Sequence, residues 1–409
     1  MTEQRQGDEH RQAQHSLAAP LALPCGVVLK HRLAKAAMSD SLGNGAGDPS
    51  EAQARLYERW AEGGAALSII GEVQGDPRFP EKPGNLVFNG DSHRGALHAL
   101  VRRGSVGGAQ LWPQLGHAGA LSDPEISQPK GPSPLSLDGL RCAGMTLADI
   151  EHLPALYAGA ARIARDAGFG GVHIHAGHGF LLSQFLSPLF NHRDDAYGGA
   201  IEARCRIVLE VIAAVRRAVG PALAIGIKIN ATDQLDGGLT GEDAVAVVRL
   251  LDRASVDLID ISGGTYFPGA PASSEGVSRN GPYFLDFARR AKAVTQVPLM
   301  LTGGFTTRQQ AAAAVAGGAV DVVGLARAMA LDVELANTWL GEAGGDPAFP
   351  RFDNPPRGGI TAWYTMRLAA LAEDREATFA PDPAAALQLY EDRDAQRRIQ
   401  WRKKFAAAG

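Results

Sequence analysis

Residues 167–180 read AGFGGVHIHAGHGF, and this stretch decides the fold. The run Val172-His173-Ile174 predicts a short buried strand, and the glycines on either side predict turns. His175 and His178 follow, three residues apart, on the glycine-rich turn. In parallel α/β proteins the ligands bind at the carboxyl ends of the strands. We therefore expect both imidazoles to face one small ligand atom.

The same unit, a short β-branched run followed by a helical stretch, recurs from about Leu21 onward. One amphipathic stretch, 201–219, carries a single apolar stripe and ends at Gly220-Pro221, which predicts a helix. Eight such units predict an α/β protein with the (β/α)8 TIM-barrel fold rather than an open sheet. The predicted strands are 33–38, 66–73, 109–115, 171–175, 223–230, 256–262, 297–302 and 320–325.

Two segments lie outside this alternation. Residues 1–18 are polar and have no apolar core, which predicts a disordered tail preceding a barrel at 19–345. Residues 346–409 follow the eighth strand and contain helical patterns at 361–372 and 383–405. We expect this C-terminal helical extension to pack on the barrel or on a partner subunit, or to cover the barrel mouth. A homo-oligomer is therefore left open. The helix that Thr146 would cap contains Pro154, which predicts a kink or a later start.

Composition excludes several classes of partner and site. The 409 residues include 45% hydrophobic and 21% charged residues, as in a globular enzyme with a large core. A formal net charge of −4 argues against nucleic acids and anionic membrane surfaces. No apolar run reaches the length of a membrane span. The three cysteines, Cys25, Cys142 and Cys205, are far apart in sequence, so we expect a reducing, cytoplasmic location and no cysteine cluster.

The last two predicted strands end in residues suited to a phosphate. Gly303 and Gly304 follow the seventh strand, and Ala326 and Arg327 follow the eighth. Glycine lets backbone N–H groups approach an anion, and arginine adds a charge-assisted hydrogen bond. TIM barrels commonly bind phosphate at these two loops. The alternative, tight turns and a surface arginine, is the less favoured interpretation.

Other strand ends supply a cation, an amide and a hydroxyl. Lys228 interrupts an apolar strand, where a lysine is costly unless it meets an anion or a cofactor. Its ammonium could instead reach water at the strand end, or form a Schiff base in a phosphate-binding aldolase. Gln114 ends the third strand and Ser39 follows the first. This set suits a planar heterocycle with a phosphate tail.

These motifs together resemble the Old Yellow Enzyme family of FMN-dependent NAD(P)H:flavin oxidoreductases, or ene-reductases. The resemblance spans about Leu21 to Ala372 and is strongest from His175 to Gly199, where the chain reads HAGHGF, then FLSP, then N, R, D and YGG. It implies one bound FMN, with NADH or NADPH as hydride donor. It also implies that the backbone of Ala36, Ala37, Met38, Ser39 and Val73 lines the isoalloxazine. Gln114 would bind its pyrimidine edge, Lys228 would face N1 and the C2 carbonyl, and Gly303, Gly304, Ala326 and Arg327 would hold the phosphate.

By the same resemblance, His175 and His178 bind the carbonyl oxygen of a small electrophilic acceptor. Negative charge develops on that oxygen when hydride adds to the β-carbon, so two donors there lower the barrier. A zinc site and a purely structural pair are the alternatives. We expect the side chain of His173 to face away from that of His175, and no acidic or cysteine ligand adjoins the pair in sequence. No metal is therefore predicted.

The sequence departs from the family pattern at Phe180. The family usually has there a tyrosine proposed to protonate the α-carbon, and a phenyl ring cannot donate a proton. Tyr266 and Tyr364 are the substitute hydroxyls in the expected substrate pocket. The departure also leaves open an NAD(P)H oxidase or quinone reductase, or a flavin-binding protein without catalytic activity. Lys228 stands where other members carry arginine, which keeps the charge but loses bidentate geometry.

Overall fold

The computed structural model describes residues 16–137, 139–270, 281–341 and 344–405. Most of the predicted N-terminal tail, residues 1–15, lies outside the described residues. Leu17 is buried, and its carbonyl accepts a hydrogen bond from the N–H of Arg32 at 2.9 Å. The chain is therefore already packed against the barrel one residue before the predicted end of that tail.

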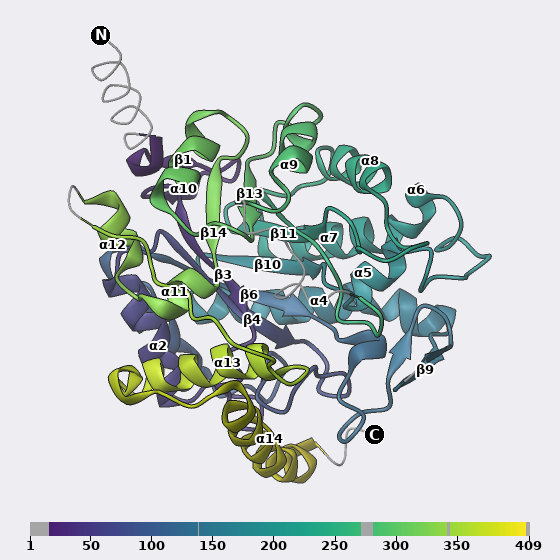
Figure 1. The fold of residues 1–409 in the computed structure, drawn as a ribbon. Coiled ribbons are helices and arrows are strands. Elements are labelled where there is room, and N and C mark those ends of the chain that lie inside the picture. The colour runs from purple at the N-terminus through teal and green to yellow at the C-terminus, as the bar shows by residue number, and fades with distance from the viewer. Residues whose placement is uncertain (1–15, 138, 271–280, 342–343, 406–409) are drawn as a thin grey trace.

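The described residues form a closed barrel of eight parallel strands, which confirms the predicted (β/α)8 fold (Figure 1). Closure comes from the pairing of the first barrel strand with both the second and the last, as Ala34 pairs with Leu67 and Gly324. The strands are β3 (Leu33–Met38), β4 (Leu67–Gln74), β6 (Gln110–Gly116), β10 (Gly171–Ala176), β11 (Ala224–Asn230), β12 (Leu258–Ser262), β13 (Leu299–Thr302) and β14 (Val322–Leu325).

Helices cover the outside of the barrel, and the sequence determines where they begin and end. In α4, Thr146 and Asp149 form a capping box, and the helix runs through Pro154 to a left-handed Gly168, so its start is not delayed. The single helix predicted at 201–219 is divided at Cys205. The outer helices are α2 (Glu51–Glu62), α3 (Arg94–Gly104), α4 (Leu147–Ala167), α5 (Leu181–Leu186), α6 (Ile201–Arg204), α7 (Arg206–Val219), α8 (Gly241–Leu251), α9 (Leu285–Lys292) and α10 (Arg308–Ala316).

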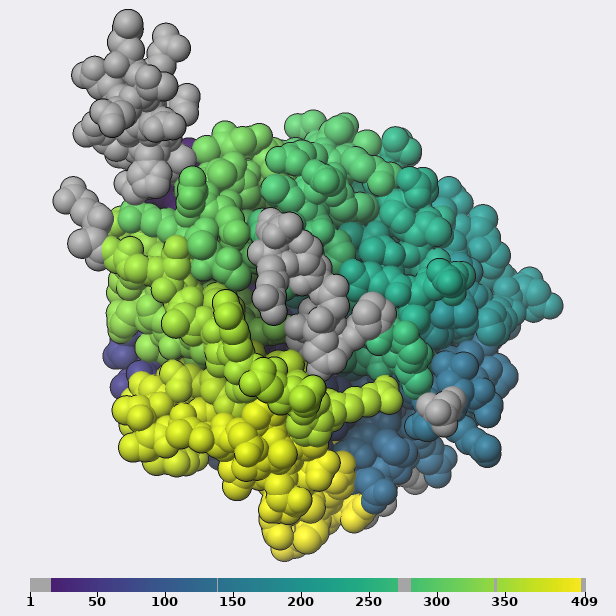
Figure 2. Space-filling view, in the orientation of Figure 1, coloured from purple at the N-terminus to yellow at the C-terminus, as the bar shows by residue number. Residues whose placement is uncertain are grey.

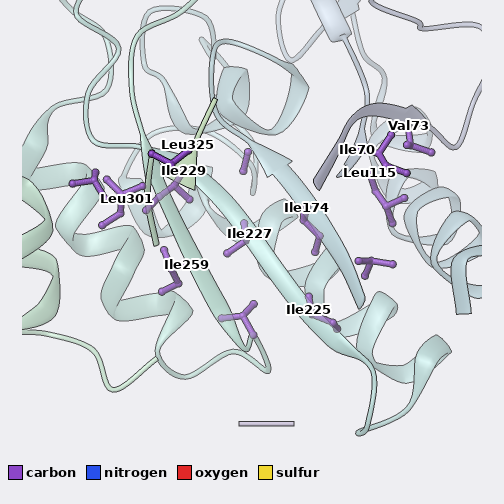
Figure 3. Close-up of a cluster of buried hydrophobic side chains, with 14 of the residues drawn as sticks. Ile70, Val73, Leu115, Ile174, Ile225, Ile227, Ile229, Ile259, Leu301 and Leu325 are labelled. Atoms are coloured by element: carbon purple, nitrogen blue, oxygen red, sulfur yellow. The ribbon is translucent and has the colours of Figure 1, made fainter. Parts of the chain in front are cut away.

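Strand alternation sorts the side chains into two layers. Ile225, Ile227 and Ile229 of β11 project from one face, within the apolar layer between strands and helices (Figure 3). Residues of the opposite parity, such as Lys228, face the barrel interior. Trp112 and Met300 fill the lower part of that interior, together with the N-terminal hairpin of residues 21–29. The remaining short strands are β1 (Leu21–Ala22), β2 (Val28–Leu29), β5 (Leu86–Val87), β7 (Lys130–Gly131), β8 (Leu135–Leu137) and β9 (Leu140–Gly144).

The residues after β14 form α11 (Arg327–Leu331), α12 (Leu335–Leu340), α13 (Gly359–Ala372) and α14 (Pro383–Phe405). Helix α14 packs on α13 and is fixed to the barrel loops, where the indole N–H of Trp401 donates to the carbonyl of Pro77 at 3.2 Å. Arg398 pairs with Asp123 at 3.0 Å. In the space-filling view this C-terminal segment, in yellow, forms one flank of the molecule (Figure 2). The extension therefore packs on the barrel of its own chain.

Among the described residues, no helix combines the length and the apolar character that a membrane span requires.

Candidate active site at the carboxyl ends of the barrel strands

A cavity of about 820 Å³ opens at the carboxyl ends of the barrel strands. It is the place where the TIM-barrel fold puts its active sites. Fourteen of the predicted site residues line it: Ala37, Met38, Ser39, Gln114, His175, His178, Phe180, Lys228, Tyr266, Gly303, Gly304, Ala326, Arg327 and Tyr364. The structure thus brings together residues that the sequence separates by more than three hundred positions.

Ala36 and Val73 are the two predicted site residues outside the cavity lining. Ala36 belongs to the apolar cluster inside the barrel, and Val73 packs in the layer beneath the helices (Figure 3). Their side chains are core residues, so any contact with a cofactor is restricted to their backbone.

The two predicted catalytic histidines converge. His175 is the penultimate residue of β10, and His178 lies on the following turn at φ +57°, where its N–H donates to Asn230 Oδ1 at 2.9 Å. His175 Nε2 lies 3.3 Å from His178 Nδ1, and His178 Nε2 lies 2.8 Å from Ser262 Oγ. Burial, followed by the charge of Lys228, lowers the pKa of His175 to about 3 and that of His178 well below its usual range. Both imidazoles are therefore neutral, and each carries one N–H.

Lys228 is buried, and its ammonium lies 2.9 Å from the carboxylate of Asp260 on the adjacent strand β12. The interpretation that this lysine reaches water is therefore wrong. Asp260 also accepts a hydrogen bond from Thr302 Oγ1 at 2.7 Å. Sequence reasoning missed Asp260, although a carboxylate at an inward position of an apolar strand carries the same signal as Lys228.

His173 faces the barrel interior beneath His175, so the prediction that it faces away is wrong. Residues two apart on a strand point to the same side, because side chains alternate. Its Nδ1 lies 3.0 Å from Gln114 Nε2, and its Nε2 lies 3.7 Å from the carboxylate of Asp260. His173 therefore supports Gln114 from below and does not line the cavity.

Two glutamates, Glu72, which is buried, and Glu81, which is half-buried, belong to the site and were not predicted. Glu72 of β4 lines the cavity with Oε1 2.8 Å from His175 Nδ1. Burial raises the pKa of Glu72 to about 8, although Lys228 opposes the shift. Glu81 accepts a hydrogen bond from Ser39 Oγ at 2.9 Å. Burial and the charge of Glu72 raise its pKa to about 7. The sequence signal for Glu72 was a carboxylate within the apolar run of β4.

The aromatic residues divide between two ends of the cavity. The ring of Phe180 lies 4.7 Å from that of His175 and 5.9 Å from that of Tyr266, measured between centroids. Tyr266 also lies 6.0 Å from His178. Tyr364 instead stacks with the guanidinium of Arg327 at 5.4 Å. Tyr266 is therefore the hydroxyl near the histidine pair, and Tyr364 belongs to the predicted phosphate end.

Helix α14 adds residues to the cavity mouth that the sequence did not assign to the site. Tyr390, Asp394 and Arg398 all line the cavity. Helix α14 therefore contacts the barrel loops and also contributes to the wall of the cavity.

The residues present fit the mononucleotide that the family resemblance predicted. A buried cation, Lys228, lies at one side of the cavity with no aligned hydrogen bond to its ammonium. Gly303 and Gly304, at φ +117° and +82°, and Arg327 lie at another side. Such a set can hold an electron-rich heterocycle and a phosphate. Among the residues that the structure describes, no cluster of three His, Cys, Asp or Glu side chains could hold a metal ion.

Comparison with known proteins agrees with the predicted flavin cofactor. Residues 16–340 match the model of the NADH:flavin oxidoreductase / NADH oxidase family. The chain is 34% identical over 351 residues to the NADH-dependent flavin oxidoreductase iliE of Hypocrea jecorina (strain QM6a), covering 78% of this chain and 87% of that protein. A protein of the same name from Neonectria sp. (strain DH2) is 36% identical over 355 residues, and the match covers 78% of this chain but only 46% of that longer protein. Among solved structures, morphinone reductase has the same fold, with 24% identity, a TM-score of 0.69 and coverage of 82% and 91% of the two chains.

Proposed function

Because this chain belongs to the NADH:flavin oxidoreductase / NADH oxidase family, we propose that its acceptor is a small electrophile, an activated alkene or a quinone. The chain is an FMN-dependent oxidoreductase that uses a nicotinamide as hydride donor. Bound FMN supplies the capacity to take up hydride from the nicotinamide and to pass it on. The acceptor class and the roles of the individual residues are what we propose.

Four groups of residues would hold FMN. Lys228 would face the edge of the ring system that becomes negative on reduction, which a cation stabilises. Gln114, held by His173, would bind the pyrimidine edge, and Ser39 would face the other carbonyl. Gly303, Gly304, Ala326 and Arg327 would bind the phosphate. The support for these roles is that their side chains or backbones line one cavity.

His175 and His178 would donate hydrogen bonds to the carbonyl oxygen of the acceptor. The observation that carries this role is the approach of two neutral imidazoles, 3.3 Å apart, at the cavity wall. Preorganised donors stabilise an oxyanion as it develops in the transition state. Ser262 Oγ holds the ring of His178 and Asn230 holds its backbone N–H, so this residue needs little reorganisation when an acceptor binds.

The test separates the two halves of the reaction in the FMN-loaded protein. In the His175→Ala, His178→Ala double variant, reoxidation by 2-cyclohexenone should fall by about 10²–10³, the usual effect of losing an oxyanion donor. Anaerobic reduction of the flavin by NADH should fall far less. His152→Ala on the outer surface of α4 is the matched control. Equal losses in both half-reactions would contradict the proposed role of the pair.

Quinone reduction is the second candidate, and Phe180 favours it. Reduced quinones take protons on oxygen from water, so they need no positioned carbon acid. Phe180 lies against His175, where it contributes no proton. Comparing turnover of a quinone and an enone therefore distinguishes the two acceptor classes.

A further inference from the structure

Glu72 reaches the cavity because β4 contains a bulge. The pairing register with β6 shifts between Ile70 and Val73, and Glu72 has φ +56°, a conformation that residues other than glycine rarely adopt. Gly71 allows the bulge, because a Cβ atom there would lie 2.1 Å from the carbonyl oxygen of Met38. Strained backbone of this kind is concentrated at functional sites. The strained backbone at Glu72 therefore indicates a functional role for this residue.

The carboxyl group of Glu72 is buried among titratable groups from several elements. Burial disfavours its charged form more than Lys228 favours it, so its pKa rises to about 8. A second carboxyl, Glu81, lies near enough that Glu72 raises its pKa. The groups facing Glu72 are His175 on β10, Lys228 on β11, Tyr157 on α4, Glu81 after β4 and Tyr266 after β12.

The contact between Glu72 and His175 requires a proton. Glu72 Oε1 lies 2.8 Å from His175 Nδ1, too close for two bare lone pairs, although the angle departs from that of a linear hydrogen bond. Catalytic hydrogen bonds are often poorly aligned before substrate binds. The His175 ring is neutral and has a single proton to place on Nδ1 or Nε2. Either the Glu72 carboxyl or His175 Nδ1 therefore carries the shared proton.

We propose that protonated Glu72 is a positioning residue that holds the ring proton of His175 on Nε2, the atom facing His178 and the cavity. The carboxyl O–H donates to Nδ1, which keeps the N–H on Nε2, where it faces His178 Nδ1 in this structure and can donate to an acceptor oxygen that binds there. This inference rests on the proposed function, in which His175 is such a donor. Second partners of histidine commonly select its tautomer in this way.

Loss of the Glu72 proton reverses the arrangement. One proton leaves to solvent, and the ring proton of His175 moves from Nε2 to Nδ1, where it donates to the carboxylate. Nε2 is then bare and repels an acceptor oxygen. The His175 donor is therefore present below the pKa of Glu72 and is lost as the pH rises through about 8.

Glu72→Gln tests this directly, because its amide N–H₂ can donate to Nδ1 at every pH and has nearly the shape of the acid. The first measurement is the ¹⁵N spectrum of histidine-labelled, FMN-loaded protein from pH 6 to 10, with His175 assigned by its loss in His175→Asn. We expect the wild-type ring to change from the Nε2–H to the Nδ1–H pattern near pH 8. In Glu72→Gln the Nε2–H pattern should persist.

The second measurement is reoxidation of the reduced enzyme by 2-cyclohexenone over the same range. The wild-type rate should fall about tenfold per pH unit above the midpoint, as the protonated fraction of one group does. The rate of Glu72→Gln should stay level. Glu81→Gln is the control for the second carboxyl, and its rate should decline with pH as that of the wild type does.

The outcomes separate the two proposals. A wild-type ring that stays in one tautomer across the range, or a decline that Glu81→Gln removes, would overturn the role of Glu72. A tautomer change that occurs without any decline in reoxidation would support that role and reject His175 as the acceptor donor. If Glu72→Gln fails to fold, the wild-type ¹⁵N titration still decides the question.

Discussion

The ammonium of Lys228 lies 2.9 Å from the carboxylate of Asp260, and both side chains are buried, with Lys228 at the wall of the cavity. Neither charge has access to water, so each depends on the other for compensation. The pair holds the lysine at the place proposed for the flavin ring. It also makes the lower wall of the site sensitive to single substitutions.

Asp260→Asn should therefore destabilise the protein by about 3–5 kcal/mol, the usual cost of leaving a buried charge unpaired. The measurement is urea unfolding of the variant and the wild type. Adding Lys228→Met removes the unpaired cation, so the double variant should recover much of that loss. A double variant less stable than Asp260→Asn alone would mean that the pair is not the source of the effect.

Arg327→Ala should weaken FMN binding by about 1.5–3 kcal/mol, the usual contribution of a hydrogen bond to a charged group. Arg327 lies at the glycine-rich end of the cavity and stacks with Tyr364. Flavin release on dilution, followed by fluorescence, gives the dissociation constant. Arg289→Ala, an exposed arginine of α9, should leave it unchanged. Equal retention by the two variants would place the phosphate elsewhere.

The sequence predicted the barrel because apolar residues repeat every two positions in strands and every 3.6 positions in helices. Both repeats can be recognised within a short segment. It predicted Lys228 because a lysine within an apolar strand is energetically costly. It predicted the histidine pair because the two residues lie three positions apart at the end of one strand. It did not predict Glu72, because a bulge changes which face a residue uses, and that depends on the close approach of Gly71 to β3. Nor did it predict which residues of α14 line the cavity, since helix docking depends on tertiary contacts far along the chain.

Glu81 makes the stability of the apoprotein depend on pH. Its pKa is about 7 in the folded protein and lower in the unfolded chain, so the folded state holds a proton that the unfolded state releases. The resulting stabilisation is full below the unfolded pKa, near 4.5, and is lost as the pH rises to about 7. Glu81→Gln keeps the neutral shape at every pH. Its free energy of unfolding should therefore rise relative to that of the wild type as the pH increases over that window. The gain should be about 1.4 kcal/mol per unit of pKa shift.

Urea unfolding at pH 4.5, 6 and 8 measures that difference. Glu151→Gln, at an exposed position of α4 outside the cavity, is the control, and its free energy of unfolding should follow that of the wild type. A constant difference between Glu81→Gln and the wild type would show that Glu81 does not hold a proton in the folded state.

Phe180→Tyr should lower the quinone-to-cyclohexenone ratio of flavin reoxidation rates. Enone reduction needs a proton on carbon, and a positioned acid is worth a factor of about 10²–10⁴. The new hydroxyl would start from a ring 4.7 Å from His175, within the site proposed for the acceptor. Tyr266→Phe tests the substitute donor, because Tyr266 lies 5.9 Å from Phe180 between ring centroids. If Tyr266 supplies the proton, its loss should slow the enone and spare the quinone, and Phe180→Tyr should rescue that variant. Ratios unchanged in both variants, with FMN still bound, would leave water as the proton source and pocket shape as the role of Phe180.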